Sequence, residues 1–287
     1  TGEPQAIPKK LSQMSREVAT LETQFGELLG AADVSTTVSH QHIYGLLFNV
    51  LWPLVAGRAI HARSFLFPQE LMAVLAEGDG LLVSSPAHLK RLPEHPVWAT
   101  TSNRLRAVFS SGGPLSFDVA CNAKRLLGLV PIEVYGSSET GGIAWRQQHT
   151  RMDEAWIPMR GITWRIDSEE GVLEVRTPHL PDESWFRTAD RAMSAGGNRF
   201  LIKGRVDRIV KIEEKRISLD AIERQLTASL MVADARVIVI EGRRQRIAAF
   251  IVPSVIGRRK LAEVGKLVFN RILRDTLSRC IDPVGIP

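Results

Sequence analysis

The chain has 287 residues, of which 44% are hydrophobic and 24% charged, and its formal net charge is +6. This length and apolar content allow a large core and one to three domains. The cations are dispersed rather than arranged in a basic stripe with interleaved aromatic residues. That distribution disfavours a nucleic-acid binder and fits a small anionic ligand or an acidic protein partner.

Two distant cysteines, Cys121 and Cys280, argue against a disulfide framework or a zinc site and fit a reducing cytoplasm. No apolar run has the length of a membrane-spanning helix, and no secretory signal is visible. We therefore expect a cytoplasmic protein without a transmembrane segment. The first residue is Thr rather than Met, which is compatible with a cut or processed chain.

Strands and helices are predicted to alternate over the first half of the chain. Apolar residues recur at helical spacing over residues 11–29, which predicts an amphipathic helix. Alternation of this kind predicts a mostly parallel α/β sheet with flanking helices, whose ligands bind at the carboxyl ends of the strands. The expected strands are 33–39, 58–61, 81–85, 105–109 and 127–134, and the expected further helices are 45–56, 68–76, 88–92 and 116–127.

The stretch YGSSETG, residues 135–141, follows the apolar run 127–134 and combines an aromatic ring, hydroxyls, a carboxylate and glycines. A Tyr ring can stack on a base, hydroxyls can bond phosphate oxygens, and a Glu can hold Mg²⁺. The loop 110–115 is expected at the same edge of the sheet. This composition suits a nucleotide, and a plain polar turn after a strand is the alternative.

The alternation of predicted strands and helices ends at about residue 142. Short strands are expected at 161–166, 172–176 and 200–203, which predicts a small distorted β-barrel. Beyond Asp207 we expect a small α+β domain, with strands at 209–212, 235–241 and 246–252 and helices at 219–230 and 261–281. The predicted domains are therefore 1–145, 146–206 and 207–287.

Several of these stretches, in this order, resemble the motifs of the adenylate-forming enzymes, which include acyl-CoA synthetases, aryl-CoA ligases and the adenylation domains of peptide synthetases. YGSSETG resembles the family's Y-G-x-T-E, and FRTAD at 186–190 resembles Y-R-T-G-D. The further matches are GRVDRIVK at 204–211, RISLDAIE at 216–223, SSGGPL at 110–115, HIYG at 42–45 and VLEVRTP at 172–178. The resemblance covers nearly the whole chain.

Both ends of the chain depart from the family pattern. The opening TGEPQAIPK, residues 1–9, resembles the end of the family's phosphate loop, T-G-x-P-K, with an insertion before Pro8. Lys9 would then approach the β- and γ-phosphates of ATP, and a frayed basic terminus is the alternative. The chain stops before the family's catalytic lysine motif. We therefore expect a fragment that lacks the N-terminal subdomain and this lysine, and that is inactive in adenylation as it stands.

The resemblance implies ATP-dependent activation of a carboxylic acid, followed by transfer to the thiol of CoA or of a carrier protein's phosphopantetheine. It implies that Ser138 bonds phosphate and that Glu139 holds Mg²⁺, and it gives catalytic roles to Lys9 and Arg205 as well. The other implied nucleotide contacts are Tyr135, Gly136 and Ser137, with Gly112, Gly113 and Pro114 across the adenine, Asp190 at the ribose, and Arg205 at ribose or phosphate.

Asp207 resembles the family's hinge, and Lys211 is either a contact of the second conformation or a surface lysine. The acyl pocket is expected around His42, Tyr44 and Ser111, and it favours an aryl or medium acyl acid, although His42 can equally be a structural histidine.

Glu214 stands where the family has a Gly near the thiol tunnel, which casts doubt on CoA as the acceptor. An acyl carrier protein is the alternative, and it would meet the basic residues of the small domain, which are Arg243, Arg244, Arg246, Arg258, Arg259 and Lys260. A non-catalytic nucleotide-binding protein is a further alternative. A Rossmann oxidoreductase is disfavoured because no G-x-G-x-x-G follows a predicted strand.

Overall fold

A computed structural model describes residues 6–65, 67–75, 78–98, 102–212, 215–240, 246–278, 281 and 283–287. The chain divides into two compact units, which are treated separately below. The first comprises Thr1–Ile166, Glu174–Thr188 and Met193–Leu201, and the second comprises Asp167–Leu173, Ala189–Ala192 and Ile202–Pro287. The division into three domains at residues 145 and 206 stays a prediction.

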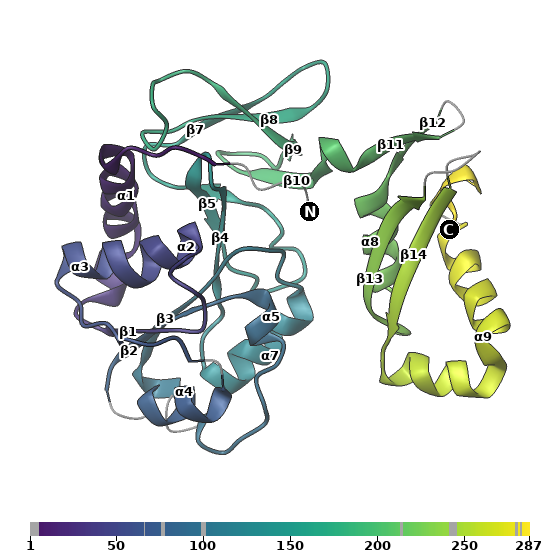
Figure 1. Ribbon diagram of the computed structural model, residues 1–287, viewed down its shortest axis with the longest axis horizontal. Helices are drawn as coiled ribbons and strands as arrows, with labels where there is room; N and C mark the ends of the chain where they lie inside the picture. The colour runs from purple at the N-terminus through teal and green to yellow at the C-terminus, as the bar shows by residue number, and fades with distance from the viewer. Residues whose placement is uncertain are drawn as a thin grey trace. The chain divides into compact units, whose positions relative to one another are not determined.

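A six-stranded sheet forms the centre of the first unit, in the order β1-β2-β3-β4-β5-β6 (Figure 1). Strands β1 to β4 are parallel to one another, β5 pairs antiparallel with β4, and β6 pairs antiparallel with β5. The predicted mostly parallel α/β sheet is confirmed. The strands are Asp33–Thr36, Gly80–Ser84, Leu105–Ser110, Ile132–Ser137, Gly141–Arg146 and Ile157–Pro158.

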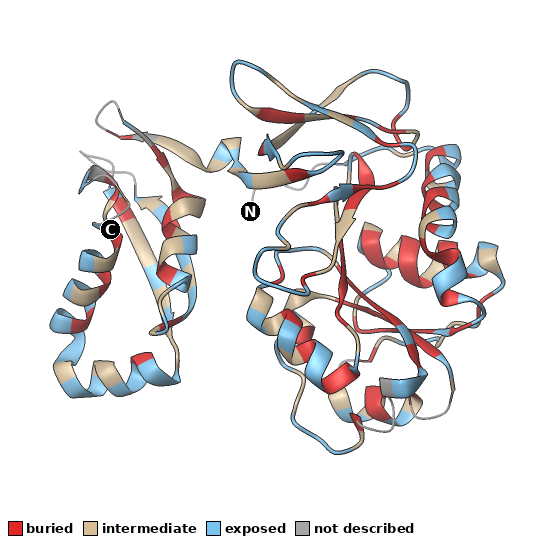
Figure 2. Cartoon of the chain, turned by 180° about the vertical axis from the view of Figure 1, so that it is seen from behind, coloured by how far each residue is buried: buried red, intermediate tan, exposed pale blue. Residues whose placement is uncertain are grey.

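Successive residues of a strand point to opposite faces of a sheet, and nearly all residues of β2 and β3 are buried. Helices therefore cover both faces of this sheet. On one face, the Phe109 ring packs 5.2 Å from both Phe25 and Phe48. On the other, Val108 and Leu82 join a separate buried cluster. The first face carries α1 (Leu11–Leu29), α2 (Ile43–Gly45), the π-helix η1 (Leu46–Leu51) and α3 (Trp52–Ala56), and the second carries α4 (Pro68–Leu75), α5 (Pro86–Leu89) and α7 (Phe117–Leu127). Figure 2 shows the central strands buried between these layers.

A second sheet of four antiparallel strands, in the order β10-β9-β8-β7, curls into a half-barrel, as the sequence predicted. Its strands are β7 (Thr163–Ile166), β8 (Val172–Arg176), β9 (Phe186–Ser194) and β10 (Phe200–Arg205).

The C-terminal part of the second unit has its own core around Ile222, Val237 and Phe269. Ser218 caps α8, accepting a hydrogen bond from the Ala221 amide at 3.2 Å, which confirms the predicted cap. The elements are η3 (Val206–Arg208), β11 (Ile209–Ile212), β12 (Lys215–Ser218), α8 (Leu219–Thr227), β13 (Val232–Ile240), β14 (Arg246–Pro253), α9 (Val255–Leu277) and η4 (Pro283–Gly285).

Some predicted elements are wrong at their edges. Helix α7 runs to Leu127 and ends where Gly128 adopts φ +77°, so the strand begins at Ile132 rather than at 127. The expected strand at 58–61 is a single bridge between Val34 and Ile60. Strand β12 was not predicted, and α9 begins at Val255 rather than at 261. None of the described helices is both long and apolar enough to cross a membrane.

Candidate functional site

The YGSSETG stretch is a tight hairpin between β4 and β5. Tyr135, Gly136 and Ser137 end β4, and the turn comprises residues 138–140. The turn closes on itself, because the Ser137 amide donates to Thr140 Oγ1 and the Thr140 amide donates to Ser137 Oγ, both at 3.2 Å. A Cβ on Gly136 would lie 2.1 Å from the carbonyl oxygen of Gly141. The two strands of the hairpin therefore approach too closely at this position for any residue but glycine.

Lys9 lies against this turn, although 130 residues separate it from Glu139 in the sequence. Its Nζ donates a hydrogen bond to the carbonyl oxygen of Glu139 at 3.0 Å. Burial lowers the pKa of Lys9, and the nearby carboxylates of Glu17 and Glu139 oppose that shift. The structure therefore brings together a lysine and a carboxylate-bearing turn that the sequence predicted separately. The segment Thr1–Gln5 lies outside the described residues.

Beneath the turn lies a carboxylate that the sequence reasoning missed. Glu17 of α1 is 2% exposed, and its Oε1 accepts a hydrogen bond from the Gly142 amide at 2.7 Å. Its Oε2 has no hydrogen-bond partner among the described residues. Burial raises the pKa of Glu17 to about 7, against the lowering effects of the Gly142 amide and of Lys9.

A buried histidine adjoins the same cluster. His179 shares a 3.1 Å hydrogen bond between its Nε2 and Thr20 Oγ1, and its carbonyl accepts from Gln13 Nε2 at 2.7 Å. Burial, with Lys9 nearby, lowers the pKa of His179 to about 4, so the ring is neutral at physiological pH. Gln13, Glu17 and Thr20 lie on one face of α1. Polar residues on a helix face directed inward are the sequence signal that could have revealed this cluster.

Tyr135 belongs to a row of aromatic rings. Its ring centroid lies 5.3 Å from that of Trp156 and 6.1 Å from that of Phe200. The guanidinium of Arg146 lies 4.4 Å over the Trp156 ring. Packing of this kind fixes the orientation of the Tyr135 ring before any ligand binds.

The loop 110–115 is tied to the same hairpin. Ser111 Oγ donates to the carbonyl oxygen of Val134 at 2.8 Å, and Gln148 Nε2 donates to the carbonyl oxygen of Leu115 at 2.9 Å. Gly112 has φ +85°, and a Cβ at Gly112 or Gly113 would meet nothing within 4 Å. Gly112, Gly113 and Pro114 are exposed, so their backbone borders open space.

The residues predicted to line the acyl pocket have different environments. His42 is exposed and caps α2, because its Nδ1 accepts from the Tyr44 amide at 3.2 Å. Tyr44 is buried with its ring 4.7 Å from that of Phe48. Burial holds the pKa of its hydroxyl well above its usual range, and the nearby backbone of Ser84 opposes that shift. The buried Ser110 Oγ and Asn49 Oδ1 have no partner in the described part of the chain.

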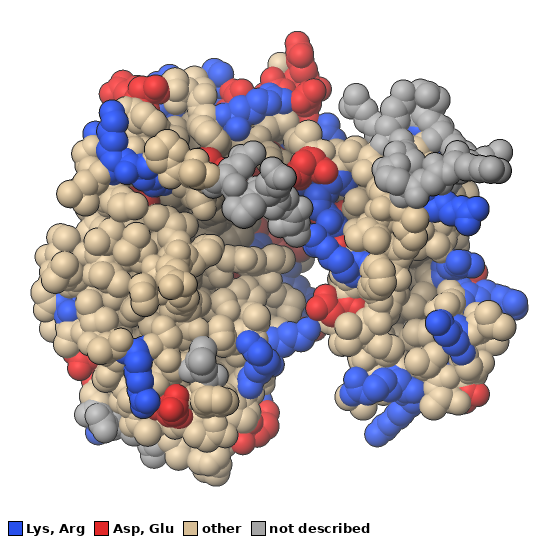
Figure 3. Space-filling view, in the orientation of Figure 1, with Lys and Arg blue, Asp and Glu red and all other residues tan. Residues whose placement is uncertain are grey.

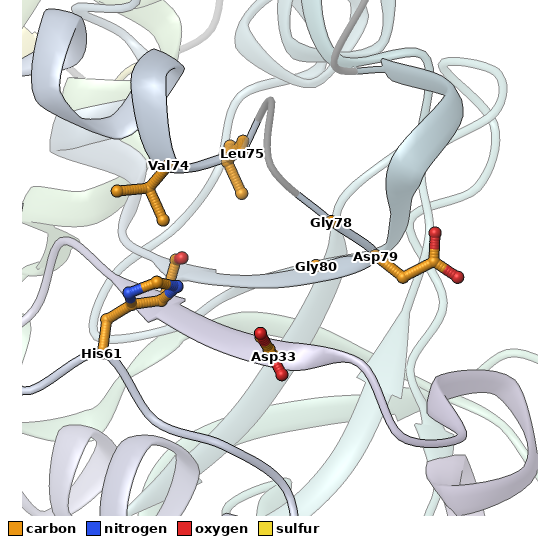
Figure 4. Close-up of a pocket in the computed structure, with 8 residues that line it drawn as sticks. Asp33, His61, Val74, Leu75, Gly78, Asp79 and Gly80 are labelled. Carbon is orange, nitrogen blue, oxygen red and sulfur yellow. The ribbon is translucent and has the colours of Figure 1, made fainter.

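A cavity of about 90 Å³ lies elsewhere, at the amino ends of β1 and β2 (Figure 4). It is lined by Asp33, Ser35, His61, Val74, Leu75, Gly78, Asp79 and Gly80. The Asp79 carboxylate points away from His61 and pairs with Arg106. The described residues hold no cluster of three or more His, Cys, Asp or Glu side chains suited to a metal. Because the cavity lies at the amino ends of β1 and β2, it is separate from the hairpin, which lies beyond the carboxyl end of β4.

The remaining predicted site residues belong to the second unit, so their approach to the turn stays a prediction. Asp190 lies within β9, because FRTAD forms part of a nine-residue strand. Arg205 donates to both carboxylate oxygens of Asp207 at 2.9 and 2.7 Å, which lowers the pKa of Asp207. Lys211 lies in β11. The predicted residues Glu214, Arg243 and Arg244 lie outside the described residues.

Comparison with known proteins identifies the family to which this arrangement belongs. Residues 1–180 match the sequence family described as AMP-binding enzyme. The chain belongs to the AMP-binding enzyme family. A 4-coumarate–CoA ligase of Rhodobacter capsulatus is 30% identical over 234 residues, which cover 79% of this chain and 55% of that protein. A 4-coumarate–CoA ligase of Cereibacter sphaeroides is 29% identical over 250 residues, which cover 84% of this chain and 51% of that protein.

Solved structures show the same fold as this AMP-binding enzyme. ATP-bound MatB of Rhodopseudomonas palustris superposes with a TM-score of 0.78 at 19% identity, covering 96% of this chain and 59% of that one. The amide bond synthetase McbA of Marinactinospora thermotolerans superposes with a TM-score of 0.79 at 18% identity, covering 100% of this chain and 63% of that one. The chain spans about half the length of the curated relatives it matches.

Proposed function

We propose that this chain belongs to an enzyme that activates a carboxylic acid with ATP and transfers the acyl group to a thiol. The contact between Lys9 Nζ and the Glu139 carbonyl oxygen, at 3.0 Å, carries the proposal. It brings a cation to the turn that carries the exposed side chain of Glu139. A triphosphate needs this combination, because its charge is neutralised by lysine and by a carboxylate-bound Mg²⁺. Membership of the AMP-binding enzyme family supports it.

In the first half-reaction, a carboxylate oxygen of the acid bonds to the α-phosphorus of ATP and pyrophosphate leaves with the bonding electron pair. In the second, a thiolate bonds to the acyl carbon and AMP leaves. Lys9 would neutralise charge on the β- and γ-phosphates, and Ser138 would bond phosphate. The exposed Glu139 carboxylate fits a Mg²⁺ that is otherwise held by phosphate oxygens, since Mg²⁺ at nucleotide sites takes one or two protein carboxylates. The metal would screen the phosphate charge.

Adenine recognition would fall to the pre-oriented ring of Tyr135 on one side and to the loop Gly112-Gly113-Pro114 on the other. The hydrogen bond from Gln148 to the Leu115 carbonyl supports a site between the ring and the loop, because it attaches the loop to the segment that directly follows β5. In the second unit, Asp190 and Arg205 would contact the ribose and phosphate, with Asp207 as the hinge. ATP and CoA are cytoplasmic metabolites, so we place the enzyme in the cytoplasm.

The acid is proposed to be an aryl or medium-length acyl acid. Tyr44 and Phe48 offer adjacent rings near the carboxyl ends of the strands, and the Tyr44 hydroxyl offers a polar contact to a ring substituent. The curated relatives named above are CoA ligases of an aryl acid, which supports this choice and favours CoA as acceptor. His42 and Ser111 have internal hydrogen bonds, and so we give them a lesser part in substrate contact.

An acyl carrier protein is the second candidate acceptor, and the charge of the second unit favours it. Arg246, Arg258 and Arg259 are exposed there, and Figure 3 shows Lys and Arg side chains gathered over this unit. An acidic carrier protein would be attracted to such a surface. Charge reversal at Arg258 and Arg259 would lower the rate of transfer to a carrier protein and leave transfer to CoA unchanged if this candidate is correct.

Two experiments test the proposal. Calorimetric titration of this chain with AMP and with ATP plus Mg²⁺ tests the nucleotide site directly. Pyrophosphate exchange, measured on the natural gene product that contains this chain, then tests acid activation across a panel of aryl and aliphatic acids. Acid-dependent exchange supports an acid–thiol ligase. Nucleotide binding without exchange for any acid would instead favour a non-catalytic nucleotide-binding protein, and the absence of nucleotide binding would contradict both.

A further inference from the structure

The polar face of α1 that lies beneath the turn needs an explanation. Burying a polar side chain is unfavourable unless it is hydrogen-bonded, and burying a charged one is more so. Gln13 and Thr20 meet this requirement through His179. Glu17, between them, has one hydrogen bond to Gly142 and a second carboxylate oxygen that has no partner among the described residues.

The hydrogen bond to Gly142 does not explain why this residue is a glutamate. A glutamine would accept the same hydrogen bond from the amide without bringing a charge into the interior. What Glu17 adds is therefore its charge. The carboxylate lies directly beneath the turn, since a Cβ built on Gly141 would be 2.3 Å from Glu17 Oε2.

Three elements besides α1 bring titratable groups into this cluster. Lys9 of the N-terminal segment interacts with Glu17 and with Glu139 of the turn, and His179 of the segment after β8 interacts with Lys9 and with Arg16 of the helix. His179 is neutral near pH 7, and Arg16 donates its NH1 to the Pro178 carbonyl at 2.9 Å. Lys9 is the cation whose charge acts on Glu17.

We propose that Glu17 is a positioning residue for the nucleotide-binding turn, which it fixes through Gly142 while its negative charge holds Lys9 at the turn. The inference rests on the proposed function, in which Lys9 meets the phosphates of ATP. A bound phosphate competes with Glu17 for Lys9 and brings further negative charge close to a buried carboxylate. Glu17 then takes up a proton as ATP binds, because protonation relieves the repulsion and leaves Oε1 to accept from Gly142.

The consequence is a contribution of Glu17 to the pH dependence of ATP affinity, which a variant without this carboxylate lacks. The pKa of Glu17, about 7 in the free protein, puts this dependence in an accessible range. Rising pH ionises Glu17 and weakens ATP binding. A neutral Glu17→Gln variant keeps the acceptor for the Gly142 amide and lacks the charge, so it should bind ATP at high pH better than the wild type does.

The test compares ATP dissociation constants of wild type and E17Q, with Mg²⁺ present, between about pH 6 and pH 8.5. ATP's own ionisation cancels in the ratio of the two constants at each pH. We expect the wild-type to E17Q ratio to rise on the order of fivefold over this range, equivalent to a coupling of about 1 kcal/mol. E22Q is the matched control, because it removes a carboxylate from the same helix that pairs with Arg58 rather than with the turn. The wild-type to E22Q ratio should stay constant.

A constant wild-type to E17Q ratio, with ATP bound by both, would overturn the inference and leave the proposed function intact. Failure of the wild type to bind ATP at every pH would overturn the proposed function, and the inference with it. A second measurement needs no substitution. In a chain labelled with ¹³C at glutamate carboxyl carbons, a resonance that titrates near neutral pH should move its midpoint upward when ATP is added. Midpoints that ATP leaves unchanged would also overturn the inference.

Discussion

The guanidinium of Arg146 donates two hydrogen bonds to the carboxylate of Glu133, at 2.9 and 3.0 Å, while it lies over the ring of Trp156. Glu133 Oε1 also accepts from Gln148 Nε2 at 2.6 Å, and the same amide group reaches the Leu115 carbonyl. Glu133 therefore links Arg146, which packs on the aromatic row at Trp156, with Gln148, which holds the loop 110–115. A buried ion pair whose remaining atoms are hydrogen-bonded holds two segments in register.

Removing Arg146 should destabilise the fold strongly. Arg146→Ala leaves the 3%-exposed side chain of Glu133 charged and partly unpaired, which costs about 3–5 kcal/mol. Arg165→Ala is the matched control, because Arg165 also pairs with a glutamate, Glu174, and also lies 4.4 Å over a tryptophan, Trp185. Its side chain is 54% exposed, so its loss should cost about 1 kcal/mol or less. Urea unfolding measures both. Equal losses of unfolding free energy in the two variants would contradict the argument that burial makes the Arg146–Glu133 pair the costlier one to break.

Gly141 should tolerate alanine far less than Gly171 does, although both have φ +69°. At Gly171 an added Cβ meets nothing within 4 Å, so the change brings backbone strain of about 1–2 kcal/mol. At Gly141 the Cβ would also overlap the Glu17 carboxylate, which adds about 1–3 kcal/mol of overpacking. Thermal unfolding of the two variants gives the comparison. The second change Glu17→Ala should partly restore Gly141→Ala and leave Gly171→Ala unaffected, and additive effects at residues 17 and 141 would contradict the overlap.

The sequence predicted the parallel sheet because its strands are apolar runs that end in glycine- and serine-rich loops. It gave no bounds for β9, since Phe186–Ser194 mixes charged and small residues and is mostly half-buried or exposed. The sequence singles out YGSSETG because its residue types suit a nucleotide in any context, and its nucleotide contacts stay a prediction.

Glu17 and Glu133 were not predicted as part of the site, since their importance depends on partners distant in the sequence. Glu133 did carry a signal, because a lone carboxylate stands within the apolar run 127–134. Glu17 adjoins Val18 within the helical pattern, where a charged residue is ordinarily assigned to the solvent side. The contact with Gly142 that buries it arises from tertiary structure.

Glu17 and His179 should have opposite effects on stability across the same pH range. The pKa of His179 falls from 6.5 to about 4 on folding, so its contribution is present above pH 6.5 and is lost as pH falls toward 4. The pKa of Glu17 rises from 4.5 to about 7, so its contribution is present below pH 4.5 and is lost as pH rises through 7. Each effect is about 3 kcal/mol at most.

The wild type should therefore show a shallow dependence of unfolding free energy on pH between about 4.5 and 6.5. In H179Q the stability should fall as pH rises through this range, because the Glu17 effect remains. In E17Q it should rise with pH, because the His179 effect remains. Urea titrations at several pH values give the three curves. Parallel curves for all three proteins would show that neither group changes its pKa on folding.

Lys9 should discriminate ATP from AMP. Its Nζ lies at the Glu139 carbonyl, where the proposed function puts the β- and γ-phosphates, which AMP lacks. Lys9→Met removes the charge and keeps the length of the side chain, so the affinity for ATP should fall by about tenfold to a hundredfold. The affinity for AMP should change by less than about threefold. Lys10→Met is the matched control, because Lys10 is adjacent in sequence and exposed, and it should alter neither affinity by more than that amount. Calorimetry with both nucleotides measures the difference. Equal losses of affinity for ATP and AMP in Lys9→Met would mean that the lysine contacts the α-phosphate or stabilises the turn. Either result would contradict its assignment to the β- and γ-phosphates.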